Sequence, residues 1–87
     1  MTDFRPMTLK RMRQDAGFSR KAAAEQINVS VRMLAHYEQG TRSPSIETVL
    51  ALAQLYQESA EDVIFAAINS RQRARGDSPQ TRRKDRR

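Results

Sequence analysis

The sequence predicts an all-α fold, a compact bundle of five short helices followed by a basic tail. Apolar residues recur at spacings of three and four along residues 8–68, and no stretch alternates as a strand does. A serine precedes four of the expected helices, where its hydroxyl can cap the first turn. The chain has 87 residues, enough for one domain with a modest core, which we expect over residues 1–69 with the tail over 70–87.

The first two expected helices are short and separated by a glycine. The first spans about residues 8–16 and ends at Gly17, a residue suited to the end of a helix. The second spans about residues 20–27, begins after Ser19, and contains a run of alanines that favours helix. Asn28 then interrupts the chain, and asparagine tolerates the left-handed backbone conformation.

Three more helices are expected after this break. The third reaches from Ser30 to Gln39 and stops at Gly40. The fourth begins after Ser45, and its apolar stripe is expected to hold Ile46, Val49, Leu50, Ala53 and Tyr56.

The fifth helix is expected over about residues 60–68. Ser59 followed by Asp62 is typical of a capping box at its start. One side of this helix should face the bundle, with Ala60, Val63, Ile64 and Ala67. Phe65 points almost opposite and Ile68 lies at the edge, which indicates a surface for a partner. The alternatives are a tail folded back over Phe65 and a phenylalanine that is simply exposed.

Positive charge is concentrated at the C-terminal end of the chain. The net charge is +6, divided as +4 over residues 1–46, −4 over residues 47–69 and +6 over residues 70–87. Residues 70–87 contain one alanine and no larger apolar side chain, so we expect disorder there. The same charge predicts a basic arm that neutralises nucleic-acid phosphates, and the alternatives are an acidic protein partner and solubility.

The composition excludes several other classes of protein. Cysteine is absent, and His36 is the only histidine, so we expect no disulfide, no metal site and no cofactor. No apolar run approaches the roughly 18 to 20 residues of a membrane helix, and residues 1–7 lack a signal-peptide core. We therefore expect no membrane contact and a cytoplasmic location. The serines are explained by capping and no phosphate loop is present, so an enzyme is not expected.

The helices on either side of Asn28–Ser30 indicate the function. Two short helices joined by such a turn form a helix-turn-helix, whose second helix can enter the major groove of DNA. At about 100° per residue, the core side of the third helix holds Leu34, Tyr37, Glu38 and, less cleanly, Val31. The opposite side holds Arg32, His36 and Gln39, with Met33 on the flank.

Four motifs in order along this region, GFS, NVS, YEQG and PSIET, resemble the lambda-repressor-like helix-turn-helix regulators of the phage repressor and XRE type. The resemblance runs without gaps from Leu9 to Ile64. It implies a sequence-specific binder of double-stranded DNA that acts as a transcriptional regulator, a repressor and a homodimer. The recognition helix is then the segment at about residues 30–39.

The resemblance also implies roles for individual residues. Base contacts fall on Val31, Arg32, Met33 and His36. Arginine is suited to paired contacts with guanine, and valine to the thymine methyl group. Phosphate contacts fall on Arg20, Lys21, Ser30, Gln39, Thr41 and Arg42, with backbone N–H groups used in the loop from Gly40 to Arg42. Arg13 and Glu38 form a buried ion pair in this interpretation, which explains two charges on core-facing positions.

The chain departs from the family pattern at several positions, and Val31 and Met33 make its base-reading face more apolar than is common. Ala23 stands where a leucine is common, so core volume must come from Phe18, Met12 and Met33. Asn28 replaces the usual turn glycine, and Arg20 replaces a glutamine and should strengthen the hold on phosphate.

The two-fold binding mode of this family makes Phe65 and Ile68 the expected contact of a homodimer. Two other functions stay open. One is an antitoxin-like protein that binds an operator while its tail binds a protein partner. The other is a protein-interaction module, in which the helix-turn-helix contacts another protein instead of DNA.

Overall fold

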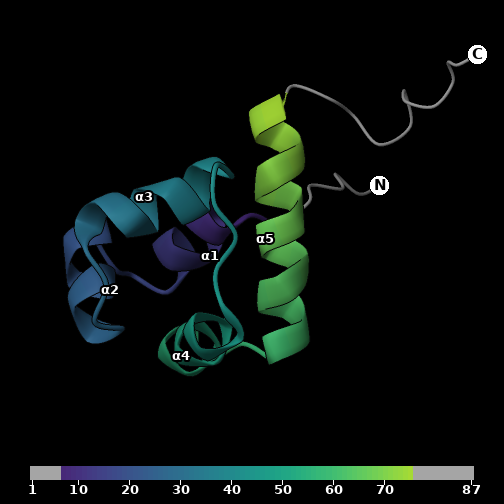
Figure 1. Ribbon diagram of the computed structural model, residues 1–87. Helices are drawn as coiled ribbons and strands as arrows, with labels where there is room; N and C mark the ends of the chain where they lie inside the picture. Colours follow the sequence, from purple (N-terminus) through teal and green to yellow (C-terminus); the bar gives the residue numbers. More distant parts are fainter. Residues whose placement is uncertain (1–6, 76–87) are drawn as a thin grey trace, which may run out of the picture.

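A computed structural model describes residues 7–75 and shows five α-helices and no strand within that range (Figure 1). The helices are α1 Leu9–Asp15, α2 Arg20–Gln26, α3 Val31–Gln39, α4 Ile46–Tyr56 and α5 Ala60–Arg75. The predicted all-α, five-helix fold is confirmed. Within residues 7–75, no helix combines the length and the apolar character that crossing a membrane requires.

Serine hydroxyls cap the helices at the predicted positions. The side chains of Ser19, Ser30 and Ser45 each accept the backbone N–H three residues further along. Ser59 does the same for the N–H of Asp62 at 3.0 Å. Each of these bonds pairs one N–H group that the first turn of a helix cannot satisfy by itself. These local contacts are the reason why the helix starts could be predicted from the sequence.

The core is built from one large apolar side chain on each of four helices. Leu9, Leu34, Leu52 and Val63 come from α1, α3, α4 and α5, and each is at most 1% exposed. In Figure 1, α5 runs along one side of the other helices, and it packs against α1, α3 and α4. This arrangement places α3 at the edge of the bundle, with one of its faces away from the core.

The small side chains of α2 allow that helix to approach the core closely. Ala23 and Ala24 are almost completely buried. Met12 is 2% exposed, and Phe18 and Met33 pack against the core while staying half-buried. These three residues were expected to supply the core volume that the leucine commonly found at position 23 would fill, and all three contact or belong to the core.

The end of α5 corrects the prediction, because the helix continues to Arg75 and does not stop near Ile68. Ser70 is 2% exposed, its hydroxyl accepts the N–H of Leu9 at 3.2 Å, and it donates to the carbonyl oxygen of Ala66. Arg71 donates to the hydroxyl of Ser43 at 3.0 Å. Polar contacts therefore attach this part of the helix to the bundle, and a pattern of apolar residues could not reveal them. The rest of the expected tail, residues 76–87, lies outside the described residues.

The apolar stripe of α4 was also predicted wrongly. Val49, Ala53 and Tyr56 are buried as expected, but Ile46 is 64% exposed and Leu50 is 54% exposed. Leu52, which was not expected on the stripe, has no exposed surface. Most of the α4 sequence is apolar on every side, so periodicity alone could not choose which face turns inward.

The buried face of α5 needs one similar correction. Val63, Ala66 and Ala67 are buried, whereas Ile64 is 40% exposed and does not lie fully under the bundle. The inward face of α5 is therefore rotated around the helix axis relative to the predicted face, so that it includes Ala66 and Ser70 and leaves Ile64 partly exposed.

Candidate nucleic-acid interface

The turn between α2 and α3 has the backbone that its sequence requires. Asn28 has φ of 61°, the left-handed conformation expected for it. The N–H of Val29 returns to the carbonyl oxygen of Ala24 at 3.0 Å, and Ser30 then caps α3. The two helices pack against each other, as Figure 1 shows. The turn thus holds α3 at a defined angle to α2.

The first turn of α3 presents exposed side chains to solvent. Val31 is 43% exposed, and Arg32 is exposed as well. Leu34, Tyr37 and Glu38 turn inward, as the helical periodicity predicts. A valine and an arginine next to each other at the start of an exposed helix offer an apolar group and five N–H donors within one turn.

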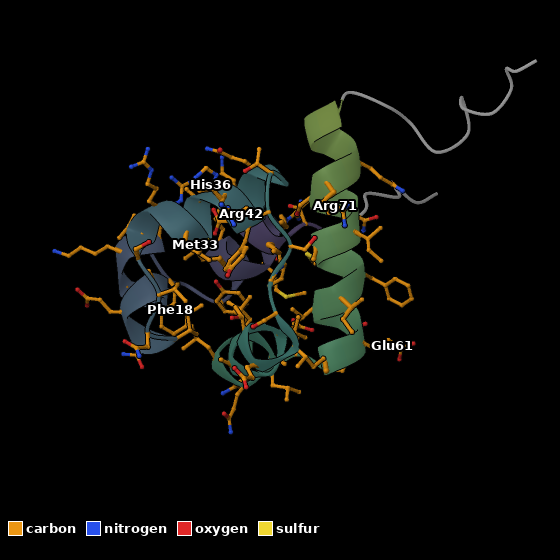
Figure 2. The ribbon with its side chains drawn as sticks, in the orientation of Figure 1. Phe18, Met33, His36, Arg42, Glu61 and Arg71 are labelled. Atoms are coloured by element: carbon orange, nitrogen blue, oxygen red, sulfur yellow. The ribbon has the colours of Figure 1, made fainter. Side chains whose placement is uncertain are left out.

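Met33 and His36, both labelled in Figure 2, lie three residues apart on α3 and differ in their surroundings. Met33 is half-buried and packs against the core, so part of its surface is taken by the protein itself. His36 is also half-buried, and its Nδ1 lies 2.8 Å from the hydroxyl oxygen of Thr41. Of the four expected base contacts, Val31 and Arg32 are therefore the most open.

The loop after α3 uses its backbone N–H groups within the protein. The N–H groups of Gly40 and Thr41 each lie 3.0 Å from the carbonyl oxygen of His36, and that of Arg42 lies 3.4 Å from it. These donors point back into the end of the helix, so they are not free for a phosphate. The expected use of loop N–H groups by a phosphate stays a prediction, and it would require these donors to leave the carbonyl oxygen of His36. The side chains of Gln39, at the end of α3, and of Arg42, in the loop, are exposed.

Arg13 and Glu38 are in direct contact inside the bundle. Nε of Arg13 lies 2.6 Å from Oε2 of Glu38, and Nη2 lies 3.3 Å from Oε1. The side chains are 9% and 2% exposed. Nη1 of Arg13 also donates to the carbonyl oxygen of Phe18 at 2.9 Å, which attaches the start of α2 to the same pair. The charges are thus buried but satisfied, as buried charges need to be.

Arg20 joins this pair from the solvent side. Its Nε donates to Oε1 of Glu38 at 3.3 Å, while its side chain is still 37% exposed. Two guanidinium groups share one carboxylate, so the cluster of Arg13, Arg20 and Glu38 keeps one positive charge at the start of α2. Lys21 is exposed beside it. This end of α2 is positive from its side chains and from the helix dipole.

Tyr56 lies next to the cluster of Arg13, Arg20 and Glu38, and its hydroxyl is shielded from water. Its hydroxyl is buried without a hydrogen-bond partner among the described residues. Burial, followed by the negative charge of Glu38, raises the pKa of Tyr56 to about 12, although the charge of Arg13 opposes the shift. The ring also lies 6.1 Å from the ring of Phe18.

Comparison with known proteins identifies this arrangement. A family model described as Helix-turn-helix (HTH_3) matches residues 9–63, more than half of the chain. The chain belongs to the helix-turn-helix family. It is also 42% identical over 53 residues to the HTH-type transcriptional regulator ImmR of Bacillus subtilis (strain 168). The match covers 61% of this chain and 42% of that protein. No solved structure matches the chain. The resemblance seen in the sequence is therefore confirmed.

The helix-turn-helix domain carries two exposed apolar side chains at the expected dimer contact. Phe65 is 55% exposed and Ile68 is 42% exposed, one turn apart on α5. Beside them lies a mostly apolar groove of about 190 Å³ between α5 and the segment that leads into α4. The lining residues include Pro44, Val49 and Ile64.

Sequence reasoning missed the residues that attach α5 to the rest of the helix-turn-helix domain. Asn69 donates to the carbonyl oxygen of Met7 at 2.9 Å, and Ser70 binds the N–H of Leu9. Ser70 follows Val63 by seven residues and therefore falls on the same helical stripe. That spacing was the one signal in the sequence that could have revealed it.

Proposed function

We propose that this chain is a sequence-specific binder of double-stranded DNA that regulates transcription and inserts α3 into the major groove. The observation that carries the proposal is the exposed face at the start of α3. Val31 and Arg32 lie there beside His36, on the second helix of a helix-turn-helix. These side chains have the length and the chemistry to contact base edges. The residues proposed to contact bases are Val31, Arg32, Met33 and His36, and Met33 would do so only with the exposed part of its side chain.

Phosphate contacts would fix α3 in the groove. Arg20 supports this role because Glu38 accepts from its Nε while the side chain stays 37% exposed. Lys21 lies on the same exposed end of α2, and Ser30 keeps a hydroxyl proton after its oxygen has accepted from Met33. At the far end of α3, Gln39 and Arg42 would use their side chains. For Thr41 we propose a different role in the next subsection.

The active form in this proposal is a homodimer joined through α5. Phe65 and Ile68 support it, because an exposed phenylalanine with an isoleucine one turn away loses unfavourable contact with water when a second copy covers both. A two-fold dimer presents two copies of α3 to half-sites about 34–36 Å apart. The matching operator is then a palindrome.

Repression is the proposed outcome of binding. A protein that occupies the major groove excludes other proteins from the same base pairs. The basic residues between Arg71 and Arg87 would add sequence-independent affinity through phosphate contacts. The proposal requires no cofactor and no catalytic step, and it puts the protein in the cytoplasm with its DNA.

Selection of bound sites from a random DNA pool at physiological salt tests the proposal. The expected result is an enriched palindrome with two half-sites about one helical turn apart. A matched selection with Arg32→Ala should lose the preference at one base pair in each half. A pool without any enriched motif would contradict the proposal and favour the protein-interaction module. A promoter that overlaps the selected site then tests repression by transcription in vitro, with lower transcript yield expected.

A further inference from the structure

His36 and Thr41 are joined by a hydrogen bond that holds one side of the histidine ring. Nδ1 of His36 lies 2.8 Å from Oγ1 of Thr41. Thr41 follows the left-handed Gly40, and its own N–H donates to the carbonyl oxygen of His36 at 3.0 Å. The other ring nitrogen, Nε2, has no hydrogen-bond partner among the described residues and is not one of their buried, unpaired atoms. The protein thus engages Nδ1 and leaves Nε2 for a ligand.

Competition for one carbonyl oxygen decides the direction of this hydrogen bond. The hydroxyl of Thr41 has one proton and two acceptors in reach, Nδ1 of His36 at 2.8 Å and the carbonyl oxygen of His36 at 3.3 Å. That carbonyl oxygen already receives the N–H groups of Gly40, Thr41 and Arg42. Nδ1 is the closer of the two acceptors, and the carbonyl oxygen is already crowded by three N–H groups. A Thr41 hydroxyl proton directed at Nδ1 would leave the proton of a neutral ring on Nε2.

We propose that Thr41 determines base preference by holding His36 as an Nε2–H donor toward the major groove. This inference rests on the proposed function, in which α3 enters that groove. An N–H donor pairs with O6 and N7 of guanine, N7 of adenine or O4 of thymine. Cytosine offers only its N4 amine, which is also a donor. His36 therefore favours guanine, which has two acceptors, and excludes cytosine at one position of each half-site.

The opposite tautomer would give the opposite preference. If Nδ1 donated to Thr41, Nε2 would be an acceptor and would pair with the amine groups of cytosine or adenine. The position of a single proton on His36 therefore distinguishes two sets of operators. Thr41 is a positioning residue in this scheme, since it acts through His36 and does not read a base itself.

The tautomer can be measured on the free protein by long-range ¹H–¹⁵N NMR of His36, with the pH raised until its spectrum no longer changes. The chain has one histidine, so the spectrum needs no assignment between residues. We expect an unprotonated Nδ1 and a protonated Nε2. A protonated Nδ1 would overturn the inference, whatever the protein binds. In Thr41→Val the two tautomers should mix, whereas Thr41→Ser should keep the wild-type spectrum.

Base preference provides the second test, by selection from a random pool with wild type, Thr41→Val, Thr41→Ser and His36→Ala. His36→Ala identifies the position that His36 faces, because only that preference should vanish. There, the wild type should prefer guanine over cytosine by about 5-fold, the lower end of what a bidentate base contact provides, because His36 offers a single donor. Thr41→Val should lose most of this ratio and Thr41→Ser should retain it. Thermal unfolding of each variant shows whether it is folded.

The outcomes separate this inference from the proposed function. If neither the wild type nor any variant enriches a motif, the proposed function fails. If the wild type enriches a motif but selects cytosine opposite His36, the inference fails and the proposed function stands. The same holds if folded Thr41→Val keeps the full wild-type ratio at that position.

Discussion

Gly40 lies directly against Ser70, so closely that a Cβ atom on Gly40 would be 2.5 Å from the carbonyl oxygen of Ser70. Gly40 ends α3 with φ of 83°, and Ser70 lies in the part of α5 that the sequence did not predict. The contact joins the end of the proposed recognition helix to the helix that carries Phe65 and Ile68. The two proposed interfaces are therefore connected by a direct backbone contact.

Replacing Gly40 by alanine should destabilise the fold by about 2–4 kcal/mol, because the new Cβ meets the α5 backbone and the left-handed conformation is unfavourable. Gly17→Ala is the matched control. Gly17 has a similar φ of 87°, but beyond its chain neighbours no atom lies within 4 Å of the position that a Cβ would take. Only the conformational cost of about 1 kcal/mol should then remain. Urea denaturation of both variants measures the difference, and equal losses would show that the close approach to Ser70 carries no cost.

Replacing Glu38 by alanine should cost about 3–5 kcal/mol of stability, since Arg13 would stay buried without its carboxylate. Asp15→Ala is the comparison, because the pair of Arg11 and Asp15 is exposed on α1. An exposed pair contributes less than about 1 kcal/mol. The midpoints of urea denaturation, read with unchanged slopes, give both values. Similar losses in the two variants would contradict a specific role for the buried pair.

Arg32→Ala and Arg20→Ala should weaken DNA binding in different ways. Loss of a base contact at Arg32 should cost about 1–3 kcal/mol on the selected site and relax the preference at one base pair. Loss of a phosphate contact at Arg20 should weaken binding to all sequences alike and lower the salt dependence. Titrations with the selected and a scrambled duplex at several salt concentrations separate the two effects. A uniform loss for Arg32→Ala would argue against base reading.

Phe65→Ser should convert the proposed dimer into a monomer, because the contact with the second copy loses its largest apolar group. Leu50→Ser is the control, since Leu50 is equally exposed at 54% but lies on α4. Sedimentation equilibrium over a range of protein concentrations gives the mass of each variant. The dimer through α5 is excluded if the wild type sediments as a monomer, or if only Leu50→Ser dissociates.

Tyr56 makes stability depend on pH in the alkaline range. Its pKa is about 12 in the folded protein against an ordinary value of 10.0. Above pH 10.0 the unfolded chain loses this proton while the folded chain keeps it, so stability should fall as the pH rises toward 12. In Tyr56→Phe the fall should be less steep, by up to about 1.4 kcal/mol per pH unit. At neutral pH this variant should be at least as stable as wild type, because an unpaired buried hydroxyl is removed. Urea denaturation between neutral and alkaline pH tests both expectations, and parallel curves would contradict the first.

The sequence by itself determined the helix starts, the turn at Asn28 and the inward face of α3. Each of these depends on neighbours within one or two turns, such as a serine hydroxyl and the N–H three residues later. The same local periodicity placed Leu34, Tyr37 and Glu38 on one side of α3 and Arg32 on the other.

Only the tertiary structure decided which stripe of α4 is buried, how far α5 extends, and which groups near α3 are already engaged. Leu50 and Leu52 are the same type of residue, yet Leu52 is buried and Leu50 is exposed, because the way α4 packs against its neighbours decides which side is covered. Ser70 binds Leu9 across 61 positions of the chain, and Arg20 meets Glu38 across 18. Contacts between distant residues arise from the packing of whole helices, so a local pattern can place a residue on the inward face but does not name its partner.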